Sequence, residues 1–431
     1  MKIDYDLIVI GDTKAAIFAV EYALQFDAKV ALFLDNKSYN NPLVTIRMLN
    51  EYWQNYHHTT WEHFCEFKQL IFLEKLNNLH SVGVDIYRGS FRVINGKKIL
   101  LSLEGLLIKS SGIILAAYPC CEWLYPQYNL LINHSIGEIN KLAKAAAKFV
   151  IFGDDIEAII LAQNLSNFGN KVTLITQNKC LLPGEDEDIS WQYQLHLESQ
   201  GVDIRLESEI GEQLEVNGDK LIITRLKQKN NQATELYENL GICWDDNRIL
   251  VNERLQTHNP KVFACGEILG GYDLDNLSYH EARVAVNNSL FLPWQRIDYN
   301  NLGYCLNTSP KITRIGYSEY EAMVLFGNNL RILKFHLDEL DLFVKFVISN
   351  DGDILGFHSL GDGLEEILNI VNAIKLRREK ISSLFSATFA DIRSYKIVET
   401  LKEEWLQHAK KRRKIIMDTC QNFFLWKRTL L

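Results

Sequence analysis

The sequence has only seven prolines among 431 residues, and no low-complexity or proline-rich linker interrupts it. No apolar run approaches the ~20 residues of a membrane-spanning helix. The first residues lack the layout of a secretory signal peptide. The eight cysteines are scattered without a spacing pattern, which is typical of a reducing compartment. We therefore expect a folded cytoplasmic protein.

The chain is too long for one compact core, so two to three domains are expected. Its hydrophobic content of 47% and charged content of 23% are typical of a folded globular protein. Three nearby histidines, His57, His58 and His63, lack carboxylate or thiolate neighbours at ligand spacing, so no metal site is predicted. The net charge of −8 argues against a nucleic-acid partner.

The clearest local pattern lies near the start of the chain. The continuous apolar run Leu7 to Ile10 is typical of a strand that is buried on both faces. Lys14 to Phe26 carries apolar residues at helical spacing, and Val30 to Leu34 is a second apolar strand. This strand–turn–helix–strand order is that of a dinucleotide-binding unit.

The turn of this unit keeps part of the glycine fingerprint. Gly11 permits the tight turn and Ala16 is an accepted third residue, but Thr13 replaces the second glycine and crowds the pyrophosphate. Lys14 adds a positive charge at the start of the helix, and Asp35 ends the second strand where an acid would bind a ribose. From this stretch alone, an ordinary βαβ unit without a ligand is an equal alternative.

A second, similar stretch begins at Lys148. A strand, a turn, a helix over Ile156 to Phe168 and a strand over Lys171 to Ile175 follow in order. Asp155 stands at the second glycine position, where its carboxylate opposes a pyrophosphate. Thr176 stands where a ribose-binding acid is expected. We therefore expect NAD(P) binding to be weak or lost here.

The segment Leu255 to Glu267, which ends in Val-Phe-Ala-Cys-Gly-Glu, makes the order of motifs recognisable. The chain resembles the two-nucleotide flavoproteins glutathione reductase, dihydrolipoamide dehydrogenase and mercuric reductase. In that family this segment carries an aspartate that binds the ribitol of FAD, and Glu267, after Gly266, occupies its position. Glu281 and Ala282 match the acidic-alanine pair that opens the next helix.

The resemblance runs from about Asp4 to Val398 and implies an α/β fold. It consists of two Rossmann-like nucleotide-binding domains plus an α+β interface, or dimerisation, domain. The expected boundaries are 1–147 and 248–300 for a discontinuous FAD-type domain, 148–247 for an NAD(P)-type domain, and 301–400 for the interface domain. A homodimer is implied. The FAD site would include Ala117, which stands in Ala-Ala-Tyr where the family has Ala-Thr-Gly, and Tyr118 could block the cleft.

Several departures from the family fall on its chemistry. The family's redox disulfide follows the first βαβ unit, but Asn36 to Asn50 contains no cysteine and the first cysteine of the chain is Cys65. A dithiol relay needs two thiols that form mixed disulfides. The family's catalytic histidine is also missing from the matching stretch Phe385 to Tyr395. No residue is therefore assigned a catalytic role.

The last segment, 401–431, has eight basic and three acidic residues, a net charge of +5. Its basic run Lys410 to Lys414 precedes an aromatic cluster at Phe423 to Trp426. Such a tail can attach to an anionic membrane surface or to an acidic protein partner. Alternatively, its aromatic residues pack on the acidic body of the protein itself.

Two hypotheses follow. The first is a divergent FAD-dependent oxidoreductase that transfers electrons to a non-disulfide acceptor, and it is cytoplasmic or peripheral to a membrane. The second is a non-catalytic pseudoenzyme that serves as a dimeric scaffold or binding module.

Overall fold

A computed structural model divides the chain into two compact units, which are described separately. Unit 1 comprises Met1–Pro183 and Gln194–Asp298, and unit 2 comprises Gly184–Tyr193 and Tyr299–Leu431. The structure describes residues 3–34, 42–56, 59–89, 92–93, 100–103, 106–117, 147–209, 220–224, 231–245, 248–272, 274–337 and 342–407.

The first sheet of unit 1 is built around β1 and β6, and the apolar residues of β1 and of β6 from Ile108 onward are buried on both faces. Its parallel strands lie in the order β3-β2-β1-β6-β13, and β5 and β4 extend β6 as antiparallel strands. The strands are β1 Tyr5–Ile10, β2 Val30–Leu34, β3 Asp85–Arg88, β4 Arg92–Val93, β5 Leu100–Leu103, β6 Leu106–Leu115 and β13 Val262–Ala264. Leu7 and Val9 illustrate the register, since both are fully buried and pair with β2 on one side and β6 on the other.

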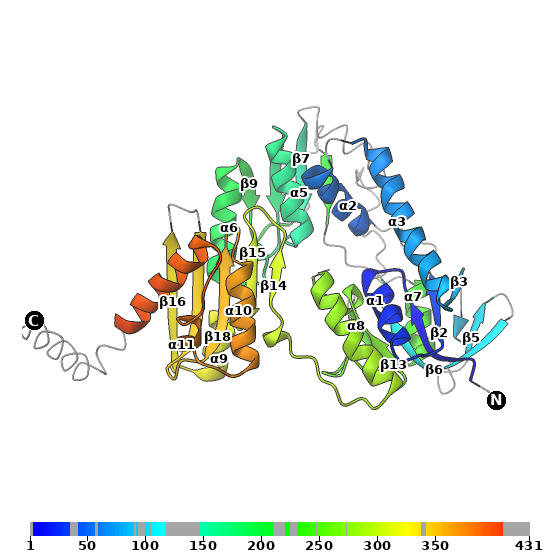
Figure 1. Ribbon diagram of the computed structural model, residues 1–431. Helices are drawn as coiled ribbons and strands as arrows, with labels where there is room; N and C mark the ends of the chain where they lie inside the picture. The colour runs from blue at the N-terminus through cyan, green and yellow to red at the C-terminus, as the bar shows by residue number, and fades with distance from the viewer. Residues whose placement is uncertain are drawn as a thin grey trace, which may run out of the picture. The chain divides into compact units, whose positions relative to one another are not determined.

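Helices α1 and α8 lie side by side in unit 1 (Figure 1), where the Phe18 and Tyr279 rings meet edge to face at 5.4 Å. Both helices begin near the carboxyl ends of the parallel strands, because α1 directly follows β1 and α8 follows β13. The helices of this part are α1 Lys14–Leu24, α2 Pro42–Asn55, α3 Trp61–Ser81, α7 Asn231–Leu240, η3 Glu267–Leu269 and α8 Asp275–Leu290.

A second sheet in unit 1 is entirely parallel, with the order β10-β7-β8-β9. The strands are β7 Lys148–Phe152, β8 Lys171–Ile175, β9 Val202–Arg205 and β10 Lys220–Ile223. Helix α5 (Ile156–Asn167) follows β7 and helix α6 (Glu187–Ser199) follows β8. A short antiparallel pair, β11 (Trp244–Asp245) and β12 (Arg248–Ile249), precedes β13.

Unit 2 is an antiparallel sheet of order β14-β15-β18-β17-β16. Its core packs α10, α11 and a helix over residues 392–407 against the sheet, with Phe346, Phe357 and Leu401 fully buried. The elements are η4 Tyr299–Asn301, β14 Tyr304–Leu306, β15 Ile312–Gly316, α9 Glu319–Phe326, β16 Leu330–Leu337, β17 Leu342–Ser349, β18 Ile354–Leu360, α10 Glu365–Leu376 and α11 Ile381–Leu384.

The mixed α/β class, with two parallel sheets and an antiparallel sheet, matches the sequence prediction. One local prediction was wrong. Glu281 lies within α8 rather than at its start, because the helix begins one and a half turns earlier at Asp275.

Candidate nucleotide-binding sites

The turn between β1 and α1 is fixed by backbone contact with the end of β6. Gly11 has φ +139°, and a Cβ there would lie 2.1 Å from the carbonyl oxygen of Ala116. No side chain fits such a space, and the dihedral itself favours glycine. Gly11 therefore makes a tight turn that brings its backbone against the end of β6.

Thr13 is the N-cap of α1, a role that its position in the fingerprint did not suggest. Its hydroxyl donates to the carbonyl oxygen of Ala116 at 2.6 Å and accepts from the N–H of Ala16 at 3.2 Å. The side chain is buried. The side chain that was expected to crowd the pyrophosphate therefore points into the protein. Its capping hydrogen bond stabilises α1 by about 1 kcal/mol, but this bond occupies the N–H of Ala16, which could otherwise donate to a phosphate.

The predicted charge of Lys14 is partly neutralised in the structure. Its ammonium lies 2.7 Å from the carboxylate of Asp275 at the start of α8, and both side chains are more than half exposed. An exposed pair of this kind exchanges partners at little cost. Lys14 thus remains able to meet an anion, whereas Asp35 and Tyr118 lie outside the described residues.

The segment after β13 comes close to α1. Gly266 has φ +79°, and a Cβ there would lie 2.6 Å from the Cβ of Ala15. Its N–H donates to the Glu281 carboxylate at 2.6 Å. Glu267 follows it, buried in the first turn of η3. The fold thus brings Gly266 close to the amino end of α1, with Glu267 next in sequence, and Ala117 lies half-buried just beyond β6.

The second turn, between β7 and α5, is built in the same way but is acidic. A Cβ on Gly153 would lie 2.0 Å from the Thr224 hydroxyl. Asp155 is the N-cap of α5 and accepts from the N–H of Ala158 at 2.8 Å. Burial, and then the charge of nearby Glu157, raises the pKa of Asp155 to about 7, against the lowering effect of its hydrogen bonds.

Internal hydrogen bonds also occupy the position where a ribose-binding acid was sought. The Thr176 hydroxyl donates to the buried Asp154 carboxylate at 2.8 Å, and the side-chain amide of Asn178 donates to the same oxygen. The β8 end is therefore tied to the β7–α5 turn by the protein's own groups. An anionic dinucleotide would have to displace these bonds and approach two carboxylates.

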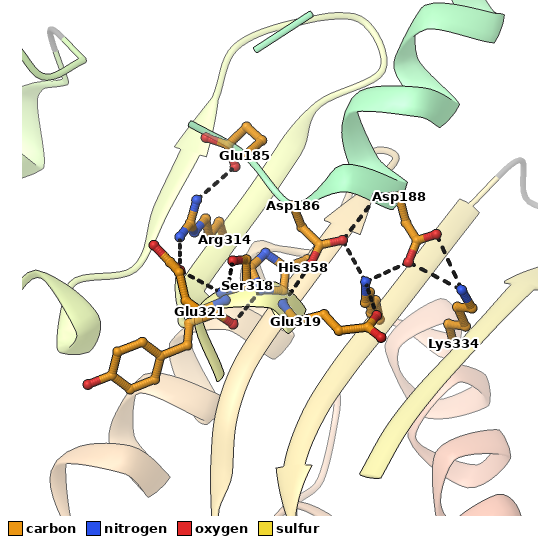
Figure 2. Close-up of polar contacts among 11 residues, drawn as sticks. Glu185, Asp186, Asp188, Arg314, Ser318, Glu319, Glu321, Lys334 and His358 are labelled. Atoms are coloured by element: carbon orange, nitrogen blue, oxygen red, sulfur yellow. Dashed lines mark hydrogen bonds and ion pairs between the residues drawn. The ribbon is translucent and has the colours of Figure 1, made fainter. Parts of the chain in front are cut away.

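Sequence reasoning missed a charged network in unit 2 (Figure 2). The ammonium of Lys345, which is only 2% exposed, lies 2.7 Å from Asp186, 2.5 Å from Asp188 and 2.7 Å from Glu319. Lys334 reaches Asp188 from the neighbouring strand at 3.3 Å. The sequence signal was a single lysine within the apolar run Leu342 to Ile348 of strand β17, together with the acidic run Glu185 to Asp188.

The network also fixes the start of α9. The N–H of Glu319 donates to Asp186 at 3.0 Å, and Ser318 and Glu321 form a reciprocal capping box.

The network also sets the pKa values of its buried groups. Burial by itself raises the pKa of Asp186, but His358, the N–H of Glu319 and Lys345 together lower it below its usual range. Burial lowers the pKa of His358 to about 4, against the raising effect of Asp186. The imidazole is therefore neutral near pH 7.

Within the described ranges, no helix is both long and apolar enough to cross a bilayer.

The family model for pyridine nucleotide-disulphide oxidoreductases matches residues 5–288. A dihydrolipoyl dehydrogenase from Bacillus subtilis is 28% identical over 268 residues, which are 56% of either chain. A mercuric reductase from Staphylococcus aureus is 23% identical over 362 residues, 74% of this chain and 66% of that one. The chain thus aligns with just over half the length of the dihydrolipoyl dehydrogenase.

The fold is similar to that of the Cu(II) complex of the HOCl-induced flavoprotein disulfide reductase RclA from Escherichia coli. The TM-score is 0.73 at 21% identity, over 93% of this chain and 99% of that chain. Members of the matched family use FAD and a pyridine nucleotide. With two Rossmann-like sheets, both nucleotide turns and the Gly266–Glu267 segment in family order, the chain belongs to the pyridine nucleotide-disulphide oxidoreductase family.

Proposed function

We propose that the chain is a divergent FAD-dependent oxidoreductase that transfers electrons to an acceptor other than a disulfide. The observation that carries this proposal is the sound β1–α1 turn. Gly11 makes the close backbone approach, and α1 presents the amides of Lys14 and Ala15, which have no acceptor within the helix. Helix amino ends of this kind attract the pyrophosphate of a dinucleotide.

The residues around this turn fit a flavin dinucleotide. Gly11 and Ala16 would allow the pyrophosphate close to the backbone, and Lys14 would exchange Asp275 for phosphate oxygens. Glu267 would accept from ribitol hydroxyls, with Gly266 held in place by Glu281. Bound FAD would supply two-electron redox chemistry, while the protein would bind and orient it.

The nicotinamide half is proposed to be weak or lost. Three acidic residues, Asp154, Asp155 and Glu157, surround the start of α5. Each ionised carboxylate near a pyrophosphate repels it, and the repulsion grows in a partly buried site. The hydrogen bonds from Thr176 and Asn178 to Asp154 also occupy the end of β8.

The disulfide relay is proposed to be missing. No cysteine lies between Asn36 and Asn50, where the family has its redox pair, and no histidine lies between Phe385 and Tyr395. Thiol–disulfide exchange needs an attacking thiolate at the site of the flavin. An acceptor that takes electrons directly is therefore favoured.

The proposed assembly is a homodimer of cytoplasmic chains. We assign 1–147 with 248–300 to an FAD-type domain, 148–247 to an NAD(P)-type domain and 301–400 to an interface domain.

We further infer that the basic tail, 401–431, attaches by charge to an anionic membrane surface or an acidic protein surface. Its +5 net charge supports this role.

The decisive experiment is the absorbance spectrum of the purified full-length protein. We expect bound flavin that is released on denaturation. Thr13→Ser, which keeps the capping hydroxyl and removes the methyl group, should retain FAD, and Thr13→Gly should bind it at least as tightly. A colourless protein that takes up no FAD at saturating concentration would refute the proposal.

A scaffold without catalysis is the second candidate. It is favoured by Thr13, whose hydroxyl uses the Ala16 amide, and by the acidic second turn. In that case the nucleotide folds would serve only as a dimeric binding module. Failure of both FAD and NADH to bind, with a folded dimer in solution, would support this candidate.

A further inference from the structure

Helix α9 of unit 2 exposes apolar side chains around most of its circumference. Only Ala322 is buried within it. Its exposed apolar side chains, which we call the α9 face, are Tyr320 (76% exposed), Met323 (51%), Val324 (68%), Leu325 (59%) and Phe326 (41%). A surface helix normally turns its apolar stripe inward and its charges outward. A patch of this density on a short helix indicates that another segment covers it.

The α9 face is held by a well-fixed helix. The capping box of Ser318 and Glu321 and the contact of the Glu319 N–H with Asp186 anchor the amino end. The N–H of Gly327 donates to the carbonyl oxygen of Met323 at the other end. The exposure of the α9 face is therefore a property of a formed helix.

The described chain ends close to the carboxyl end of α9. The Arg331 guanidinium lies 4.9 Å from the centre of the Trp405 ring, in the helix 392–407 that is red in Figure 1. Arg331 also donates to the side chain of Asn350 at 3.3 Å. The N–H of Asn350 donates to the carbonyl oxygen of Asn329, three residues beyond α9. The last described helix thus contacts the segment that follows α9.

The remaining 24 residues are long enough and have suitable charge. Even as a helix they would extend for roughly 36 Å, whereas α9 is about 12 Å long. They carry seven basic residues and one acidic residue. Unit 2 up to Gln407 carries nineteen acidic and twelve basic residues. The tail and unit 2 therefore attract each other, and Phe423 to Trp426 would provide apolar side chains for the α9 face.

We propose that residues 408–431 dock on the α9 face of their own chain. The aromatic cluster Phe423 to Trp426 covers Met323, Val324 and their neighbours, while the basic run Lys410 to Lys414 lies against the acidic surface of unit 2. The inference rests on the proposed electrostatic role of the tail and names its partner. An anionic membrane and a second copy of the chain are the competing occupants.

The test uses the full-length protein and limited trypsin digestion at the basic run. At low salt we expect slow cleavage between Lys410 and Lys414. Met323→Glu with Val324→Glu should accelerate cleavage by about tenfold or more, and high salt should do the same. The control is Leu376→Glu, which changes an equally exposed apolar residue of unit 2 outside α9 and should leave the rate unchanged.

A cross-link identifies the occupant. A photoreactive group attached at Val324→Cys should couple to tail peptides within the same chain, as judged from mixed heavy- and light-isotope protein. Cross-links that join heavy to light peptides would overturn the proposal in favour of a second copy. Equal capture of wild type and the α9 variant by phosphatidylserine vesicles, without coupling to the tail, would overturn it in favour of a membrane. Salt-insensitive cleavage with no vesicle binding would instead refute the electrostatic role itself.

Discussion

Replacing Lys345 by methionine should strongly destabilise unit 2. The change removes the cation that is shared by Asp186, Asp188 and Glu319, and Asp186 is 1% exposed. Removing one partner of a buried ion pair costs about 3–5 kcal/mol, because the remaining charge is left uncompensated. Since 1.4 kcal/mol corresponds to a factor of ten, amides of β17 should exchange with deuterium roughly 10²- to 4 × 10³-fold faster.

The matched control is Lys334→Met on the neighbouring strand. Lys334 also pairs with Asp188, but its side chain is 53% exposed. Loss of an exposed pair costs about 1 kcal/mol or less, so exchange in β17 should change less than about tenfold. In Lys345→Met with Asp186→Asn, the neutral amide still accepts from the N–H of Glu319, and part of the protection should return.

The measurement is hydrogen exchange of the full-length chain, read on peptides from β17. This readout reports on unit 2 itself, whereas a global unfolding curve of a chain with several domains is not two-state. If Lys345→Met exchanges no faster than Lys334→Met, the buried network does not hold this sheet together. The reasoning from burial would then be wrong.

Three further predictions concern pH, nucleotide affinity and turnover. The pKa of His358 is about 4 in the folded protein, below the unfolded value near 6.5. Its contribution to the free energy of unfolding is therefore complete above pH 6.5 and is lost as pH falls towards 4, a loss of roughly 3 kcal/mol. His358→Asn should flatten the resulting pH dependence of hydrogen exchange in β18. Calorimetry should find that NADH binds no more tightly than about millimolar at pH 8. Asp155→Asn should strengthen NADH binding more at pH 8 than at pH 6, because Asp155 is already mostly protonated at pH 6. Micromolar binding of NADH by the wild type would contradict this prediction. Glutathione disulfide and lipoamide should not be reduced with NADH or NADPH. Cys120 and Cys121 are adjacent in the sequence, and turnover that persists after both are replaced by serine would contradict this prediction.

The sequence alone predicted the two strand–turn–helix–strand units and their places along the chain. Leu7 to Ile10 and Val30 to Leu34 are continuous apolar runs, a pattern that places a strand inside a sheet covered on both faces. Gly11 marked the first turn, because a glycine directly after a buried strand and before a helical pattern is the first residue of the dinucleotide-binding fingerprint. These features depend on near neighbours in the chain, so their patterns are visible without the fold.

The roles of single polar residues were decided only by the tertiary structure. Thr13 caps α1 and bonds to Ala116, 103 residues away, and Asp154 meets Thr176 across the end of a sheet. Lys345 is buried among carboxylates from a segment about 160 residues earlier in the sequence. Hydrogen bonds and ion pairs act over a few ångströms, so they depend on which distant segments the fold brings together, and no local pattern records that choice.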